Sequence, residues 1–392
     1  MKRILALLLV PTLLLGADAE KAKKKLAKMD YEPDEKGFVK AADDGEKKAV
    51  ELFLEAGINV NARGRYGNTP LIEAADGANT EIVAMLLKAG ADPNLRNNEG
   101  RSALYYAVQG CGGNDPQGKV LDLLLAAPSI DLKTPYKRGA TLVHLAVETD
   151  SDVQLKKLLA KGLDPNAKNE AGETPLAYAS TYGRAKVLAV LSSASGVQQD
   201  VRNADGETPL LGAASTGEVA AGMKLLSGGA DAKATDKNGE TALHKLASLS
   251  KHNRVTFKVD DAKSNEFVET LIAKGTPVDA KRKYDGTTAL LVAVQQGHVP
   301  TVTTLLAKGA NPNAANNLGE KPILIAAKNG DAEVVKALLD GKADPNVSDR
   351  VGRSALKLAQ DYPEVVALLK GAGAKEGAGG KAGAPAAKKP KK

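Results

Sequence analysis

The stretch at residues 113–119 is a candidate for phosphate binding. It reads Gly-Asn-Asp-Pro-Gln-Gly-Lys and fits the first seven positions of a P-loop, in which backbone N–H groups hold the phosphates of a nucleotide. The eighth position of that loop needs Ser or Thr, whose hydroxyl reaches the magnesium ion, but Val120 stands there. No strand pattern precedes the stretch either. The sequence therefore predicts no nucleotide site, and we expect no cofactor.

Other reactive residues are present, but their spacing does not build a site. Residues 236–239 match part of a calcium loop, yet Ala234 and Lys245 occupy its first and twelfth positions, where ligands are needed. The single Cys excludes a multi-cysteine metal site. No Ser has the surroundings of a nucleophile elbow. If the protein is an enzyme, its catalytic residues would come from two segments, 110–118 and 250–264. The candidates there are Cys111, Asp115, His252, Asp260 and Asp261.

The net charge of the chain is concentrated at its end. The 392 residues carry a formal charge of +7, which by itself favours a nucleic-acid-binding protein. From Lys375 onward there are six Lys and one Glu, and residues 1–19 add a further +1, so residues 20–374 carry only about +1. Because a nucleic-acid groove needs clustered positive charge on the folded body, nucleic acid is the less favoured partner.

The two ends of the chain differ from the region between them. Lys2 and Arg3 precede an apolar run over residues 4–15, and Ala17-Asp18-Ala19 supplies the small residues of a cleavage site, so residues 1–19 are predicted to be a signal peptide. The run is too short for a membrane helix, and Ala17 stands where a lipoprotein would need Cys. Lysines at 21 and 23–25 oppose translocation. Residues 375–392 hold only Lys, Gly, Ala, Pro and one Glu and are predicted to be a disordered tail.

A short motif recurs between these ends. The best copies are Gly-Asn-Thr-Pro-Leu at 67–71, Gly-Glu-Thr-Pro-Leu at 172–176 and the same five residues at 206–210. Looser copies carry Ser102, Thr141, Thr241, Thr288, Lys321 and Ser354 at the Thr position. Successive spacings are 33, 39, 33, 34, 33, 47, 33 and 33 residues. A fixed period near 33 residues is typical of a stack of one supersecondary unit.

Each unit can be interpreted as a helix pair. Thr69 is a good helix N-cap and Pro70 suits the first helical turn. Apolar residues at 82, 83, 85, 86 and 87 form one face of a second helix, and Gly90 fits the left-handed residue that ends it. Polar turn residues at 91–100 then lead through a protruding loop into the next cap.

These motifs closely resemble the ankyrin repeat. The copy at 141–146, Thr-Leu-Val-His-Leu-Ala, keeps the family's His, and the loop signatures at 90–94, 162–166 and 309–313 match as well. His244 and His298 also sit at consensus positions, where the imidazole is expected to bond a neighbouring turn. The resemblance covers roughly residues 36–374 and implies an all-α repeat solenoid. It would have about ten repeats, each a helix-turn-helix with a protruding loop, terminal caps, and a concave face formed by inner helices and loop tips.

Several segments depart from this pattern. Insertions at 110–118 and 250–264 lengthen two units, both between the helices of a repeat. The domain order is then 1–19 signal peptide, 20–35 basic linker, 36–374 repeat domain and 375–392 tail.

The loop tips carry the residue types that often anchor interfaces, Tyr and Arg. We predict partner binding by tips and by tyrosines of the inner helices. The candidate residues are Arg63, Arg65, Tyr66, Arg96, Tyr105, Tyr136, Lys137, Arg138, Tyr178, Tyr182, Arg282 and Tyr284. A solvated surface row, partly neutralised by nearby carboxylates, is the alternative for the tips, and core packing is the alternative for each inner tyrosine.

The resemblance implies binding in general and not a particular partner. We predict a monomeric, non-catalytic protein-binding scaffold, exported to the periplasm or the outside of a bacterial cell, with no small-molecule substrate. The tail lysines are expected to make at most weak contact with anionic membrane or cell-wall polymer. The alternatives are nucleic-acid binding through the basic segments, and an enzyme with a site in the two insertions.

Overall fold

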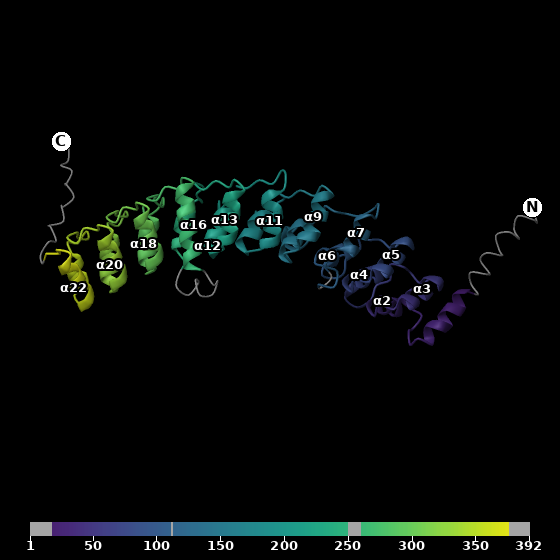
Figure 1. Cartoon of the computed structure of the whole chain (residues 1–392). Coiled ribbons are helices and arrows are strands. Elements are labelled where there is room, and N and C mark those ends of the chain that lie inside the picture. The colour runs from purple at the N-terminus through teal and green to yellow at the C-terminus, as the bar shows by residue number, and fades with distance from the viewer. Residues whose placement is uncertain (1–17, 111–112, 250–259, 376–392) are drawn as a thin grey trace, which may run out of the picture. The chain divides into compact units, whose positions relative to one another are not determined.

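The computed structural model describes residues 18–110, 113–249 and 260–375 (Figure 1). Over these residues it contains α-helices, short 3₁₀ turns and three isolated β-bridges, and no extended strand. The chain divides into two compact units, residues 1–175 and 176–392. The predicted class, an all-α repeat solenoid, is confirmed. No helix in the described ranges is both long and apolar enough to cross a membrane.

The first unit is a series of helix pairs. Its helices are α2 (Glu35–Asp43), α3 (Lys47–Glu55), α4 (Pro70–Asp76), α5 (Thr80–Lys88), α6 (Ala103–Val108), α7 (Lys119–Leu125), α8 (Leu142–Glu148) and α9 (Asp152–Ala160), with 3₁₀ turns η1 (Arg65–Gly67) and η3 (Lys137–Gly139). The first helices of successive pairs, α2, α4, α6 and α8, pack on one another, and so do the second helices α3, α5 and α7.

The second unit repeats the arrangement. Its helices are α10 (Pro175–Thr181), α11 (Ala185–Ser193), α12 (Pro209–Thr216), α13 (Val219–Ser227), α14 (Ala242–Ala247), α16 (Asp261–Ala273), α17 (Ala289–Gln295), α18 (Val299–Ala307), α19 (Pro322–Asn329), α20 (Ala332–Asp340), α21 (Ala355–Leu358) and α22 (Pro363–Gly371). Helices α12, α14, α17, α19 and α21 form the row of first helices, while α13, α16, α18, α20 and α22 form the row of second helices, seen side by side in Figure 1.

The predicted cap at Thr69 is confirmed, whereas Thr208, the N-cap residue of α12, makes no side-chain cap hydrogen bond. The hydroxyl of Thr69 accepts the N–H of Ile72 at 3.3 Å. Pro70 follows in the first turn, where a backbone N–H would have no acceptor within the helix, so the missing N–H of proline costs no hydrogen bond. Thr288 caps α17 in the same way. Gly90 has a φ of +87°, the left-handed conformation expected after α5.

Small apolar side chains fill the space between helices. Ala74, Ala75, Ala107 and Ala146 of the first helices are fully buried, as are leucines and valines of the second helices such as Leu86. Because neighbouring helices approach over Ala, each repeat needs few large side chains, which accounts for an aromatic content of only 3%.

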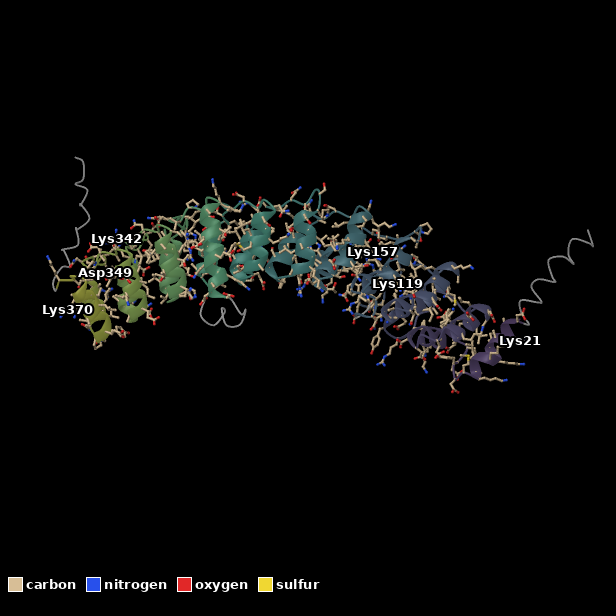
Figure 2. All side chains as sticks on the ribbon, in the orientation of Figure 1. Lys21, Lys119, Lys157, Lys342, Asp349 and Lys370 are labelled. Carbon is tan, nitrogen blue, oxygen red and sulfur yellow. The ribbon has the colours of Figure 1, made fainter. Side chains whose placement is uncertain are left out.

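Loops between repeats form hairpins fixed by an Asp or Asn side chain. The Oδ1 atom of Asn97 accepts the N–H groups of Glu99 and Arg101, at 3.0 and 2.9 Å. Asn203, Asp236, Asn316 and Asp349 repeat both contacts three residues before a left-handed Gly. Such side-chain turns satisfy N–H groups that a protruding loop would otherwise leave to solvent. Figure 2 labels Asp349 in one of these hairpins.

The N-terminal end of the described chain is a helix over residues 18–27, which begins in the last two residues of the predicted signal peptide and continues into the segment predicted as a basic linker. Ala22 and Leu26, four residues apart on one helix face, are buried, whereas Lys21, Lys24 and Lys25 are exposed. Phe38 of α2 stacks on Phe53 of α3 with ring centroids 5.1 Å apart, and the Tyr31 ring meets Phe53 edge-on. This aromatic cluster closes the core at the first repeat.

Both insertions lie between the two helices of a repeat, as predicted. The first precedes α7, and the second separates α14 from α16. Residues 261–264 of the second insertion form the first turn of α16, a helix of 13 residues where the other second helices in this unit have nine. Residues 111–112 and 250–259 of the insertions, the predicted signal peptide up to residue 17, and the tail beyond Lys375 lie outside the described residues.

Candidate functional site

Three arginines of the hairpins connect each loop to the next. The guanidinium of Arg63 donates to the carbonyl of Gly67 in its own hairpin and to that of Arg96 in the next, at 3.1 and 2.9 Å. Arg202 repeats this pattern with Gly206 and Thr235. Arg96 donates to Gly100 and also to Pro135 and Thr134, at 3.1 and 3.0 Å. Each of these arginines therefore joins two hairpins about one repeat apart.

Tyr136 lies beneath Arg96, with the guanidinium 4.4 Å from its ring centroid. Its hydroxyl is 2.8 Å from the Ser102 hydroxyl, and its ring centroid is 5.2 Å from that of Tyr105. Burial raises the pKa of the Tyr136 hydroxyl. Tyr105 is half-buried and carries Arg101 over its ring at 5.1 Å. Tyr105 and Tyr136 thus have packing roles in the described structure, and each keeps one partly exposed edge.

Four of the predicted residues are exposed at the tips of two hairpins. Arg65 and Tyr66 stand on η1, with the Arg65 guanidinium 4.8 Å from the Tyr66 ring, and 61% of Tyr66 is exposed. Lys137 and Arg138 stand on η3 and are exposed as well. Tyr66 and Arg138 occupy the same position, directly before the hairpin glycine, and both have a positive φ, 62° and 60°.

The remaining candidates lie in the second unit. Tyr178 of α10 and Tyr182, the residue that follows α10, have ring centroids 4.4 Å apart, and Tyr182 is 54% exposed. Arg282 is partly buried and its Nε atom lies 2.7 Å from Glu240 Oε1, while Tyr284 beside it is 62% exposed. Arg282 is therefore held by the protein's own carboxylate, and Tyr182 and Tyr284 offer exposed rings.

A cluster of charges that sequence reasoning did not find lies around Lys245 of α14. Its Nζ atom is 2.8 Å from Glu207, 2.8 Å from Asp236 and 2.9 Å from Glu240, and only 14% of its side chain is exposed. Burial alone would lower the pKa of Lys245, but the three carboxylates raise it above its ordinary value. Burial likewise acts to raise the pKa of Asp236, and Lys245 together with backbone N–H groups holds it below its ordinary value.

The four partners of this cluster come from three consecutive hairpins, because Arg282 extends it through Glu240. The sequence signal was weak: the residues are up to 75 positions apart, and each appears at a loop position where charged residues are common. The arrangement ties neighbouring repeats together and has no exposed reactive atom.

The histidines at consensus positions bond neighbouring turns, as predicted. The Nδ1 atom of His144 accepts the N–H of Thr141, and its Nε2 atom lies 3.1 Å from the carbonyl oxygen of Glu173. His244 repeats this with Thr241 and Thr287. Burial lowers the pKa of both imidazoles. His298 differs, because it caps α18 and its Nε2 atom lies 3.1 Å from Asp261.

The acidic residues considered for catalysis serve as helix caps or ion partners. The Asp115 carboxylate accepts the N–H groups of Lys119 and Val120 at 2.9 and 2.8 Å, which occupies the amides of the P-loop-like stretch that a phosphate would need. Lys157 of α9, labelled near Lys119 in Figure 2, donates to the Gly118 carbonyl. Asp260 caps α16. Cys111 and His252 lie outside the described residues, within which no cluster of His, Cys, Asp or Glu could hold a metal.

A stack of capped helix pairs with projecting hairpins defines a repeat scaffold, and comparison with known proteins agrees. Ankyrin repeat models match residues 10–97, 38–134 and 112–203 in one form and residues 290–339 in another, together more than half of the chain. The chain belongs to the ankyrin repeat proteins. Ankyrin repeats are generally protein–protein interaction modules, and proteins built from them are typically non-catalytic scaffolds.

Among solved structures, the chain is similar to the human ASB11 ankyrin repeat domain. The two share 24% sequence identity over 60% of this chain and 98% of the ASB11 chain, with a TM-score of 0.49. A comparison with curated proteins gave no match.

Proposed function

We propose that this chain is a non-catalytic scaffold that binds a protein partner through its hairpin tips and the adjoining face of its first helices. The observation that carries the proposal is the exposure of Arg65, Tyr66, Lys137 and Arg138 at the tips of two hairpins in one unit. Tyr and Arg supply large contact area and several hydrogen-bond donors, so they are favoured at interfaces. Tyr105 and Tyr106, half-buried on α6, continue this surface onto a first helix.

Export to the periplasm or the outside of a bacterial cell is part of the same proposal. It rests on the basic start, apolar run and small residues of 1–19. Removal of these residues is compatible with the fold, because the first buried side chain of the described helix is Ala22. N-terminal sequencing of the protein recovered after cell fractionation tests this: we expect Glu20 as the first residue of an envelope product. A full-length cytosolic protein would refute export and leave the binding proposal in place.

Site-specific photo-crosslinking tests the binding surface. A crosslinking amino acid placed at Tyr66 or Lys137 of the full chain is expected to capture a discrete partner in cells. The same group at Val351, which is 72% exposed on a hairpin of the second unit, serves as the control. Equal capture at all three positions, or capture at Val351 alone, would contradict the proposed surface.

A further inference from the structure

The hairpins of residues 63–68 and 134–139 lack the side chain that fixes most of the others, and so does the hairpin of residues 282–287, where Lys283 stands three residues before Gly286. The position three residues before the hairpin glycine holds Asn or Asp in the hairpins described above, where its oxygen accepts two loop N–H groups. In the hairpins of residues 63–68 and 134–139 the position is occupied by Gly64 and Tyr136, which have no such acceptor. Both loops instead wind through a 3₁₀ turn, with Tyr66 and Arg138 in the left-handed region.

This conformation is unfavourable for both side chains. A bulky L-residue at positive φ crowds its Cβ atom against the backbone, whereas Asn or Gly tolerates the region. Backbone strain held by the surrounding fold is found preferentially at functional sites. Two independent hairpins of the same unit place a large side chain at this position, and in both cases it is exposed.

The charge of these hairpins also sets them apart. Over residues 63–68, 96–101 and 134–139, the first three hairpins of the first unit, the sequence has six basic residues and one acidic residue, whereas the fourth hairpin of that unit, residues 168–173, has one basic and two acidic residues. The corresponding hairpin residues of the second unit, at 202–207, 235–240, 282–287, 315–320 and 348–353, have six basic and seven acidic residues. Within the part of the chain that the structure describes, Arg65, Lys137 and Arg138 have no ion-pair partner. Three exposed cations therefore face solvent, Arg65 beside the Tyr66 ring on the first hairpin and Lys137 and Arg138 on the third.

Acidic groups on the first helices limit what can bind here. Next to this hairpin surface, Glu73 of α4 is partly buried and Asp76 at the end of α4 is exposed, and desolvation by the surrounding protein raises the pKa of both carboxyl groups. Asn68 at the base of the first hairpin donates to Glu73 at 2.9 Å. A polyanion lying across tips and helices would meet these carboxylates, but an anionic segment that stays on the tips would not.

We propose that the tips at Arg65-Tyr66 and Lys137-Arg138 bind an acidic segment of the partner protein, with an extended stretch of its chain following the row of hairpins. This inference rests on the proposed binding function and adds the chemistry of the partner. Carboxylates pair with guanidinium groups through charge-assisted hydrogen bonds, and the exposed Tyr66 ring adds apolar contact. A linear segment is needed because the two tips are separated by a complete intervening hairpin.

The test measures binding of fluorescein-labelled poly-L-glutamate to the full chain at low and moderate salt by fluorescence anisotropy. Every protein in the series carries Gln in place of the lysines at 381, 388, 389, 391 and 392, so that the basic tail does not bind the probe. The test variant is Tyr66→Asn with Arg138→Asn, because Asn accepts the left-handed backbone. The matched control is Lys283→Asn with Tyr284→Asn, which removes the same types of side chain from a hairpin of the second unit.

We expect the test variant to bind polyglutamate about tenfold more weakly without any fall in its thermal midpoint, and the control to change by less than about twofold. Equal weakening in both variants, or none in either, would overturn the inference. Tighter binding of a single-stranded DNA of equal charge would overturn it in favour of nucleic acid. If a partner crosslinks at Tyr66 but polyglutamate binding is unaffected by the test variant, binding stands and the acidic partner is refuted.

Discussion

The guanidinium of Arg96 lies over the Tyr136 ring, 4.4 Å from its centroid, and donates to the two carbonyls that precede this tyrosine in the chain. One side chain thus fixes the position of the next hairpin by stacking and by hydrogen bonding. Because Tyr136 in turn contacts Ser102 and Tyr105, the contact extends from a loop tip to a first helix.

Replacing Arg96 by Ala is expected to destabilise the protein by about 1–2 kcal/mol, since it removes three hydrogen bonds to carbonyls and a cation–π contact in a partly exposed setting. Arg96→Lys keeps the charge but loses the planar fork, so it should recover less than half of that loss. Urea denaturation followed by circular dichroism measures both. Arg65→Ala, which loses only an exposed stack on Tyr66, is the control and should change stability by less than about 0.5 kcal/mol. Equal effects of Arg96→Ala and Arg65→Ala would show that Arg96 does not join the hairpins.

Replacing Lys245 by Met is expected to cost about 2–4 kcal/mol, because three carboxylates of low exposure would lose the cation that neutralises them. Lys263→Met is a suitable control: its ammonium is 3.8 Å from Asp260 and 70% of its side chain is exposed, so its ion pair is weak. Denaturation of the two variants beside wild type gives the comparison. If the Lys245→Met protein is as stable as the control, the ion pairs of Lys245 make no net contribution to the free energy of unfolding.

Gly222 of α13 leaves room for the Phe267 ring of α16. A Cβ atom at residue 222 would come within 2.3 Å of the Phe267 Cζ atom, closer than real side chains allow. Gly222→Ala is therefore expected to lower the free energy of unfolding by about 1–3 kcal/mol, although Ala is the better helix former by roughly 1 kcal/mol. Gly371→Ala at the end of α22, where nothing lies within 4 Å, should leave stability unchanged or raise it. If thermal unfolding ranks these two variants the other way, the packing of α13 on α16 is not as described.

The repeat, its helix caps and its turns could be predicted because each depends on residues close together in the sequence. Thr69 needs only the following turn to act as a cap, and Gly90 only its own backbone angle. The roles of Arg63 and Arg96 could not be predicted in the same way, because their acceptors are carbonyls of the next hairpin, which carry no side-chain signal. These two residues were proposed as binding residues, and each guanidinium makes hydrogen bonds inside the stack, two for Arg63 and three for Arg96.

The Lys245 cluster and the Gly222–Phe267 contact depend on long-range packing. Phe267 follows an insertion that breaks the 33-residue period, so its register against α13 is not given by the repeat. The left-handed backbone of Tyr66 and Arg138 has only a weak sequence signal, the missing Asn or Asp three residues before the glycine, because the hairpin of residues 282–287 lacks it as well and has no left-handed residue other than glycine. The absence of this Asn or Asp can be interpreted only from the structure, in which the side chain is seen to accept two loop N–H groups in other hairpins.

The two buried histidines predict how stability depends on pH. The Nδ1 atom of His144 accepts an N–H, so the proton of the neutral ring is on Nε2 and points at the Glu173 carbonyl. A second proton on Nδ1 would face the Thr141 N–H, and the charged ring would be buried. His244 is held in the same way by Thr241 and Thr287. The pKa of each folded imidazole is therefore below its ordinary value near 6.5, which applies to the unfolded chain.

Because the unfolded state binds protons more readily, the stability that these histidines provide is complete above about pH 6.5 and is lost as the pH falls below it toward the folded pKa, by about 1 kcal/mol per histidine over the first pH unit. Urea denaturation at a series of pH values between about 5.5 and 7.5 measures the slope, a window in which unperturbed Asp and Glu remain charged. The double variant His144→Gln with His244→Gln should be less stable at neutral pH and show a flatter pH dependence, because Gln does not titrate. Carboxyl groups with raised pKa values, such as Glu73, contribute equally to both proteins and cancel in the difference. A double variant with the same pH slope as wild type would mean that these imidazoles are not protonated on unfolding.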